Sequence, residues 1–210
     1  MSTDRSFVFE QHKFNQRLGI LENKNILVTG GSGFIGSHLV DRLIENGNSV
    51  IVIDNYSTGM RTNNNIKAVY HDADLCSYVG KIEKLVEILH KYKIEVVYHL
   101  AASADVFLSI NNPERVLEIN VLASVTLIRA CQKMKVNKFV FASTSAVYGE
   151  PEYLPVNDCH KTNPISPYGL SKLNFEQYLK YFSSYSDINI TIFRLPNVYG
   201  PRQRSDLEGG

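Results

Sequence analysis

The stretch from Ile26 to Val40 constrains the fold of this chain more than any other part of the sequence. An apolar, β-branched run meets spaced glycines there, and a helical pattern follows directly. Gly31, Gly33 and Gly36 fit the spacing G-x-G-x-x-G, and counting from Gly30 gives G-x-x-G-x-x-G. A missing side chain allows a tight turn and lets the backbone approach a phosphate closely. The stretch therefore predicts a strand that turns into a helix whose N-terminal N–H groups face a pyrophosphate.

Apolar strand patterns alternate with amphipathic helical patterns along the rest of the chain. This alternation favours an α/β fold built on a doubly wound parallel sheet. Right-handed crossovers and a glycine motif after the first strand predict a Rossmann-like strand order of 3-2-1-4-5-6, with helices on both faces. The predicted strands cover residues 26–29, 49–54, 68–71, 96–100, 139–142 and 190–195, and the predicted helices cover residues 34–46, 81–92, 113–134 and 166–185.

The composition is that of an ordinary soluble globular protein, with 44% hydrophobic and 20% charged residues. A net charge of +1 gives no reason to expect nucleic acid or an anionic membrane as a partner. No apolar run approaches membrane-spanning length, and the N-terminal residues lack the apolar segment of a signal peptide. Cys76, Cys131 and Cys159 lie far apart without C-x-x-C spacing, which predicts reduced thiols in a cytoplasmic protein and no metal site.

An acidic residue, Asp54, ends the predicted second strand 18 residues beyond Gly36. A carboxylate at this place accepts hydrogen bonds from the adenosine ribose hydroxyls and repels a 2′-phosphate, which favours NAD over NADP. An aspartate that merely caps a turn is the alternative, and it is less favoured at this spacing. Asp74 and Leu75 follow the predicted third strand, where they could bind and cover the adenine.

The sequence shows one domain, because it contains no internal repeat and no second domain boundary. We expect residues 25–210 to form an NAD-binding domain. Residues 1–24 read as an N-terminal extension, helical around residues 14–21, to which we assign no function.

Tyr168 and Lys172 lie four residues apart in a predicted helix, with Ser166 as its N-cap and Pro167 at its first position. This spacing puts the two side chains on one helix face. The pKa of an unperturbed tyrosine, about 10, is too high for a base at neutral pH. A nearby ammonium group and a positive nicotinamide ring would both lower that pKa. An exposed helix pair is the alternative, which the dinucleotide signature upstream outweighs.

Hydroxyl side chains gather at the end of the predicted fifth strand, where Thr144 lies between Ser143 and Ser145. In a parallel sheet the ligand crevice lies outside the carboxyl ends of the strands. We expect Thr144 to bind both the reacting hydroxyl and the tyrosine, and its two serine neighbours to cap the strand end. Two histidines are assigned no chemistry: His99 is expected to form hydrogen bonds in the core, and His160 to be solvated in a loop.

With these residues assembled, the chain resembles the extended short-chain dehydrogenase/reductases, and among them the NAD-dependent nucleotide-sugar epimerases of the UDP-glucose 4-epimerase type. The resemblance covers residues 25–204 in family order. It is carried by Val28-Thr29-Gly30-Gly31-Ser32-Gly33-Phe34-Ile35-Gly36, Asp54-Asn55, His99-Leu100-Ala101-Ala102, Asn120-Val121, Val147-Tyr148-Gly149, Ser166-Pro167-Tyr168-Gly169 with Lys172, and Arg194-Leu195-Pro196-Asn197-Val198-Tyr199-Gly200-Pro201-Arg202.

The resemblance implies a role for each matched residue. Thr144, Tyr168 and Lys172 match the catalytic Ser/Thr-Tyr-Lys set, and Lys172 also holds the nicotinamide ribose. The implied cofactor-binding residues are Gly30, Gly33, Phe34, Ile35 and Gly36 at the pyrophosphate, Asp54, Asn55, Ser57, Thr58 and Gly59 at the ribose, Asp74 and Leu75 at the adenine, Leu100, Ala101, Ala102 and Asn120 along the cofactor, and Tyr168, Lys172 and Pro196 at the nicotinamide; Thr144, Tyr168 and Asn197 contact the substrate.

The implied reaction is a transient oxidation of a nucleotide-diphosphate sugar, with UDP as the expected nucleotide, to a 4-keto sugar that is then reduced on its other face. Ser145-Ala146 stands where the 4,6-dehydratases carry Asp-Glu directly after the catalytic threonine. Ala104 and Phe107 also depart from residues that are frequent in the family, a lysine and an arginine. The missing acid and base disfavour a dehydratase. A UDP-glucuronate decarboxylase or a nucleotide-sugar dehydratase is nevertheless the nearest alternative.

Members of the family continue into a smaller C-terminal substrate domain, most of which we expect this chain to lack. Without that domain water would be poorly excluded from the sugar. A non-catalytic NAD-binding module is therefore the alternative from another functional class. The family also dimerises through two long helices, which correspond here to residues 113–134 and 166–185, so a homodimer is expected.

Overall fold

The computed structural model describes residues 21–205, so the predicted helix around residues 14–21 falls almost entirely outside the described residues. Six strands form one sheet of order β3-β2-β1-β4-β5-β6, and every neighbouring pair is parallel. The predicted strand order is thereby confirmed. The strands are β1 (Asn25–Thr29), β2 (Ser49–Asp54), β3 (Val69–Asp72), β4 (Val96–His99), β5 (Lys138–Thr144) and β6 (Asn189–Leu195).

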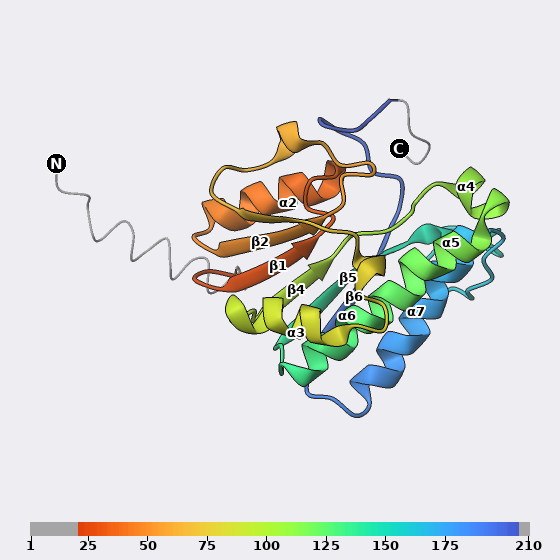
Figure 1. Ribbon diagram of the computed structural model, residues 1–210. Coiled ribbons are helices and arrows are strands. Elements are labelled where there is room, and N and C mark those ends of the chain that lie inside the picture. Colours follow the sequence, from red (N-terminus) through yellow and green to blue (C-terminus); the bar gives the residue numbers. More distant parts are fainter. Residues whose placement is uncertain (1–20, 206–210) are drawn as a thin grey trace, which may run out of the picture.

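Helices lie on both faces of the sheet, as predicted (Figure 1). One face is covered by α2, and the other by α3, α6 and α7. The helices are α2 (Phe34–Glu45), α3 (Ile82–Lys91), α4 (Val106–Asn111), α5 (Pro113–Leu117), α6 (Ala123–Lys133) and α7 (Pro167–Ser183), and the shorter turns are η1 (Arg61–Asn63), η2 (Leu75–Tyr78), η3 (Glu118–Leu122) and η4 (Ser145–Val147).

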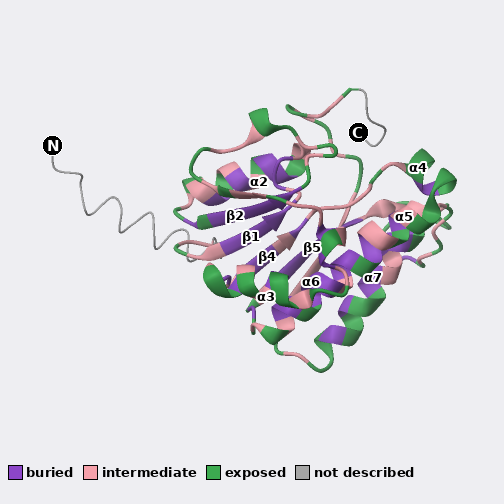
Figure 2. Cartoon of the chain, in the orientation of Figure 1, coloured by how far each residue is buried: buried purple, intermediate pink, exposed green. Residues whose placement is uncertain are grey.

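Strand β1 lies at the centre of the sheet and is buried on both faces (Figure 2). Its side chains alternate between two hydrophobic clusters, because successive residues of a strand point to opposite faces. Ile26 and Val28 pack with Val40 of α2, whereas Leu27 packs in the cluster that includes Phe175 of α7. Burial on both faces explains why the strand sequences read as continuous apolar runs.

The helical stretch from residue 113 to 134 differs from the prediction of one uninterrupted helix. The segment η3, between α5 and α6, is a π-helical turn with a wider winding than an α-helix. Asn120 lies in this turn, and its side chain bonds to Ser103 and Ser171 on two other segments. A second difference is α4, which was not predicted; Asp105 caps it by accepting a hydrogen bond from the backbone N–H of Leu108.

The parallel arrangement brings the predicted site residues to one edge of the sheet. Thr29 at the end of β1 pairs in register with His99, and Thr144 at the end of β5 pairs with Leu195. The loops that follow these strands therefore share the edge formed by the carboxyl ends. Among residues 21–205, no helix is both long enough and apolar enough to cross a membrane.

Candidate active site

The turn between β1 and α2 is packed so closely that it requires glycine. Gly30 has a φ of +72°, and a Cβ added there would lie 2.8 Å from the backbone nitrogen of Ala101. A Cβ on Gly36 would lie 2.1 Å from the carbonyl oxygen of Gly30. The loop from Leu100 to Ala102 is thereby held against the glycine turn, which brings together two of the predicted cofactor-binding segments.

The N-terminus of α2 suits an anion. Its N-cap is Gly33, which has no side chain to cap the helix, and its first turn contains no acidic residue. The first N–H groups of a helix have no intrahelical acceptor, and the helix dipole favours negative charge at this end. The backbone of Phe34 and Ile35 thus provides the environment that a pyrophosphate needs.

The segment after β6 folds back over the same helix end. The Pro201 carbonyl lies 2.9 Å from Nε2 of His38, and Gly200 packs against the ring of Phe34. Pro196 and Asn197, the residues predicted to contact nicotinamide and substrate, are exposed and directly follow β6. They begin one residue beyond Leu195, the register partner of Thr144, so they lie at the same sheet edge as the hydroxyl cluster.

Asp54 is buried at the end of β2 and is tied to the glycine turn. Its Oδ2 accepts from the backbone N–H of Ser32 at 2.9 Å, and its Oδ1 accepts from that of Tyr56 at 2.8 Å. Asp54 is therefore a turn-capping aspartate as well as the predicted ribose ligand. An ionised carboxylate has about four acceptor positions, so two of them stay available for ribose hydroxyls. Gly59 closes the loop of residues 55–59 against Ser32, since a Cβ there would lie 3.0 Å from the Ser32 side chain.

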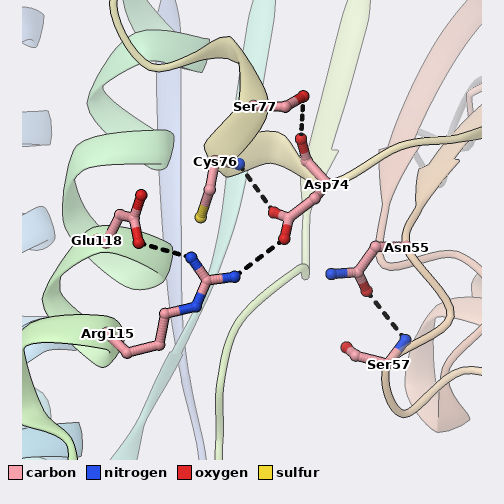
Figure 3. A network of polar contacts seen from close by, with 7 residues as sticks. All are labelled: Asn55, Ser57, Asp74, Cys76, Ser77, Arg115 and Glu118. Carbon is pink, nitrogen blue, oxygen red and sulfur yellow. Dashed lines mark hydrogen bonds and ion pairs between the residues drawn. The ribbon is translucent and has the colours of Figure 1, made fainter.

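Asp74 lies between three segments of the chain (Figure 3). Its Oδ1 accepts from the backbone N–H of Cys76 at 2.9 Å and so caps η2, and its Oδ2 accepts from Nη2 of Arg115 at 3.0 Å. Burial by itself raises the pKa of Asp74, but hydrogen bonds from Cys76 and Asn55 and the Arg115 charge lower it below its ordinary value. Sequence analysis missed Arg115, because it lies on a distant helix and no local motif marks it. Leu75, the other predicted adenine residue, is buried beside Asp74.

Thr144 and Tyr168 are brought together, as predicted. Thr144 ends β5, and its side chain interacts with that of Tyr168 in the direction that lowers the tyrosine pKa. Helix α7 begins as expected, since Oγ of Ser166 accepts from the backbone N–H of Gly169 at 3.0 Å and Pro167 is the first residue of the helix. A Cβ on Gly169 would lie 2.7 Å from the carbonyl oxygen of Ala146, so glycine lets the start of α7 approach the turn that follows Thr144.

Lys172 lies one turn after Tyr168 and is fully buried. Its Nζ donates to the carbonyl oxygen of Ala142 at 2.9 Å and lies 4.8 Å from the ring centroid of Phe141. Burial lowers the pKa of Lys172 to about 7, and the charge of Glu176 opposes this shift. A lysine with this pKa can exchange a proton at neutral pH.

The pKa of Tyr168 differs from the expectation. Burial raises it above its ordinary value, and only the hydrogen bond with Thr144 acts in the lowering direction. Lys172 does not contribute to the shift of the Tyr168 pKa, so the predicted lowering by a neighbouring ammonium is not found. The effect of a positive nicotinamide ring stays a prediction.

Behind Lys172 lies a buried ion pair that sequence analysis missed. Glu176, one turn further along α7, accepts from Nη2 of Arg194 at 2.7 Å. Ser143, expected to cap a strand end, instead donates its hydroxyl proton to the same carboxylate. The only local signal for this ion pair was the spacing Lys-x-x-x-Glu on one helix. The contact between Glu176 and Arg194 of β6 forms only in the tertiary fold.

The Asn120 side chain connects two segments of the site by hydrogen bonds. Its Nδ2 donates to the carbonyl oxygen of Ser103 at 3.0 Å and to Oγ of Ser171 at 2.9 Å, while its Oδ1 accepts from the backbone N–H of Ser103. Both amide protons are used in these contacts. The residue therefore fixes the loop after β4 relative to α7, beside the predicted cofactor.

Of the predictions for the two histidines, the one for His99 is confirmed and the one for His160 is wrong. His99 is buried in the core between the hydroxyls of Thr29 and Ser124, each 2.7 Å from a ring nitrogen, and burial lowers its pKa to about 3. The prediction of a core histidine is confirmed. His160 is not solvated, because its ring packs against Tyr148 and Tyr153 and accepts a hydrogen bond from the chain at residue 152.

The fold and this site together define a class of protein: an α/β dinucleotide-binding domain with a Thr-Tyr-Lys set at the carboxyl ends of its strands. The NAD dependent epimerase/dehydratase family matches residues 26–209, and the chain belongs to this family. NAD, the predicted cofactor, is the one that the family description names.

Several known proteins are similar to this chain. A putative UDP-glucose 4-epimerase of Methanocaldococcus jannaschii is 46% identical over 186 residues, which cover 88% of this chain and 59% of the relative. The structure of a UDP-glucose 4-epimerase of Thermotoga maritima with UDP-glucose aligns with a TM-score of 0.84 at 41% identity, covering 89% of this chain and 60% of that one. The Thermus thermophilus UDP-glucose 4-epimerase, solved with NAD, aligns with a TM-score of 0.82 at 38% identity and coverages of 88% and 59%. The chain thus spans about three fifths of the length of these relatives.

Proposed function

We propose that this chain is the cofactor-binding part of an NAD-dependent UDP-sugar 4-epimerase. The observation that carries the proposal is the placement of Tyr168 and the buried Lys172, one turn apart on α7, beside the strand end that carries Thr144. These groups lie at the same sheet edge as the glycine turn, which is the arrangement a hydride transfer beside a tyrosine base requires. The names of the relatives support the same reaction.

The residues present fit NAD along its whole length. The uncapped N-terminus of α2 suits the pyrophosphate, and the carboxylates of Asp54 and Asp74 follow β2 and β3 where the adenosine would lie. The nicotinamide end would then lie near Tyr168, Lys172 and Pro196. When bound, NAD⁺ supplies an acceptor for the hydride of the sugar C4 and returns that hydride later.

The proton follows a separate path through the side chains of the chain itself. Tyr168 as phenolate takes the proton of the C4 hydroxyl, while Thr144 donates a hydrogen bond to the phenolic oxygen and accepts one from the substrate. A positive nicotinamide ring would favour the phenolate, and Lys172 would hold the nicotinamide ribose hydroxyls. Rotation of the 4-keto sugar would present its other face to the cofactor, so that C4 is inverted when it receives the hydride on that face. Tyr168 would return the proton to the C4 oxygen.

The turn after Thr144 favours an epimerase over a dehydratase. Dehydration needs an additional acid and base, but Ser145 and Ala146 follow Thr144 directly, and the Ala146 N–H donates to Oγ1 of Thr144. A dehydratase or decarboxylase of the same family is thus the less favoured candidate.

Product analysis tests the proposal. We expect an intact enzyme, in which this chain is joined to a C-terminal substrate domain, to convert UDP-glucose to UDP-galactose in the presence of NAD⁺, as measured by chromatography of the nucleotide sugars. A decarboxylated or dehydrated product from the corresponding substrate would contradict it. Calorimetric titration separates the remaining candidate, because a non-catalytic module would bind NAD but no UDP-sugar.

We further propose that the chain forms a cytoplasmic homodimer through α5, η3 and α7. A groove between α5 and α7 is lined by Pro113, Leu117, Pro167 and Leu170, and its two leucines are 45% and 49% exposed. Tyr181 of α7 is 64% exposed. A second copy would cover this apolar surface with the same surface of its own. Sedimentation at micromolar concentration should give a dimer, and a strictly monomeric profile would contradict this assignment.

A further inference from the structure

Arg115 joins two acidic side chains at the edge of the predicted adenosine site (Figure 3). Its Nη1 donates to Oε2 of Glu118, three residues along the same helical stretch, and its Nη2 donates to Oδ2 of Asp74. The backbone N–H of Arg115 is itself fixed by the Asn112 side chain that caps α5. About two fifths of the Arg115 side chain and one third of that of Asp74 are exposed, so the pair lies within reach of a ligand.

The Asp74 carboxylate is oriented from three directions. The η2 backbone binds Oδ1 through Cys76, Arg115 binds Oδ2 from α5, and the Asn55 amide faces the carboxylate from the loop after β2 (Figure 3). An ionised carboxylate only accepts hydrogen bonds, and about four acceptor positions are available. With the Cys76 N–H, the Asn55 amide and the Arg115 guanidinium as donors, at most one acceptor position stays open. That position requires a donor, and the contact with Arg115 helps to fix its direction.

Adenine meets this demand, because its 6-amino group is a hydrogen-bond donor. In hypoxanthine a carbonyl oxygen replaces that amino group, so two acceptors would face each other. We infer that Arg115 is a positioning residue that fixes Asp74 so that the site selects a 6-amino purine at the adenosine end of the cofactor. This inference rests on the proposed function, since it takes Asp74 as the adenine ligand.

A charge alone would not have this effect. The guanidinium is a planar fork that reaches Glu118 with one nitrogen and Asp74 with another, whereas an ammonium group has no such fixed geometry. Arg115→Lys keeps the positive charge but loses the planar geometry, so we expect it to lose part of the preference for adenine over hypoxanthine. Arg115→Met keeps the length of the side chain but removes both contacts.

The experiment compares the dissociation constants of NAD and of nicotinamide hypoxanthine dinucleotide, measured by calorimetry without UDP-sugar. We expect the unaltered protein to bind NAD about tenfold more tightly than the hypoxanthine analogue, because two facing acceptors would replace a hydrogen bond. A tenfold ratio corresponds to about 1.4 kcal/mol. Arg115→Met should reduce this ratio to about two- to threefold, mainly by weakening the binding of NAD. Arg115→Lys should give an intermediate ratio.

Arg42→Met provides the matched control. Arg42 forms the same kind of pair with Glu45, three residues along α2, at an exposed position near the end of that helix. This variant should keep the tenfold ratio. Asp74→Asn serves as the reference for loss of the acceptor, and the double variant Asp74→Asn/Arg115→Met should show no further change if Arg115 acts through Asp74.

The outcomes separate this inference from the proposed function. If the unaltered protein binds neither dinucleotide, the proposed function and the inference both fail. If it binds NAD but Arg115→Met, folded by circular dichroism, keeps the full preference for adenine, only the inference is overturned. A change in stability without a change in the ratio would likewise make Arg115 a purely structural residue.

Discussion

Arg194 and Glu176 form a buried ion pair that joins the last strand of the sheet to the helix that carries Tyr168 and Lys172. Nη2 of Arg194 lies 2.7 Å from Oε2 of Glu176, and Nε lies 3.1 and 3.2 Å from the two carboxylate oxygens. The Glu176 side chain is only 2% exposed. The hydrogen bonds of the pair raise the pKa of Arg194. The position of α7 relative to β5 and β6 depends on this contact.

We predict that Arg194→Met destabilises the fold by about 3–5 kcal/mol, because it leaves the Glu176 carboxylate buried without its partner. Urea unfolding followed by circular dichroism measures the free energy of unfolding. Replacing both residues, as Glu176→Leu/Arg194→Met, should recover part of the loss. The exposed pair of Arg42 offers a control, since Arg42→Met should change the free energy by less than about 1 kcal/mol. If Arg194→Met and Arg42→Met lowered the free energy of unfolding by the same amount, the stabilising role of the Arg194–Glu176 pair would be refuted.

The glycine turn provides a second prediction, because two of its glycines have different surroundings. A Cβ on Gly36 would meet the Gly30 carbonyl oxygen at 2.1 Å, whereas a Cβ on Gly33 would meet the same atom at 3.3 Å. Gly36→Ala should therefore destabilise the fold by at least about 1–3 kcal/mol, since the backbone has to move. Gly33→Ala should fold with a smaller loss. Thermal unfolding of the two variants side by side tests the difference, and equal melting temperatures would contradict it.

The fold was predictable because its signals are local and repeated. The central strands β1, β2 and β4 contain apolar runs, the glycine turn follows β1, and Ser166 with Pro167 marks the start of α7. These signals do not depend on contacts with distant segments. The strand order then followed from general rules on crossovers. The π-helical turn η3 was not predictable, because no residue of its sequence marks it off from the helical pattern on either side. The contacts of Asn120, which lies in this turn, with Ser103 and Ser171 are tertiary and carry no sequence signal.

The site was predictable where a motif carries it and not where pairs form across the fold. Thr144 and Tyr168 could be matched to a known pattern, and they do meet. The partners of Asp74 and Glu176 could not be found, because Arg115 and Arg194 lie on other elements and ordinary charged residues carry no sequence mark of burial. The prediction that His160 is solvated was wrong for the same reason, because nothing in its loop sequence indicates that aromatic rings pack against it.

If Tyr168 is the base of the proposed reaction, Tyr168→Phe should lower kcat for the conversion of UDP-glucose by about 10²- to 10⁴-fold, because only the phenolic oxygen is lost. The loss should appear in kcat rather than in stability, which unfolding curves would check. Tyr178 lies on the same helix and is 46% exposed, so Tyr178→Phe should leave kcat unchanged. An active Tyr168→Phe variant would remove the residue from the mechanism.

The burial of Lys172 predicts how stability depends on pH. The pKa of this lysine is about 7 in the folded chain, below its ordinary value of 10.5, so between these pH values the unfolded chain binds more protons. Stability must then rise with pH across this window, by at most about 1.4 kcal/mol per pH unit from this one group. Below pH 7 both states are protonated and the contribution of Lys172 to the slope disappears.

The comparison with Lys172→Met isolates this contribution, since the other titrating groups are common to both proteins. We expect the free energy of unfolding of the unaltered protein to rise more steeply from pH 7 to pH 9 than that of the variant, by about 1–3 kcal/mol over the interval. Lys91, an exposed lysine at the end of α3, provides the control: Lys91→Met should keep the full slope. Parallel curves for the unaltered protein and Lys172→Met would mean that the buried ammonium keeps its proton throughout, with Glu176 compensating for the loss of solvent.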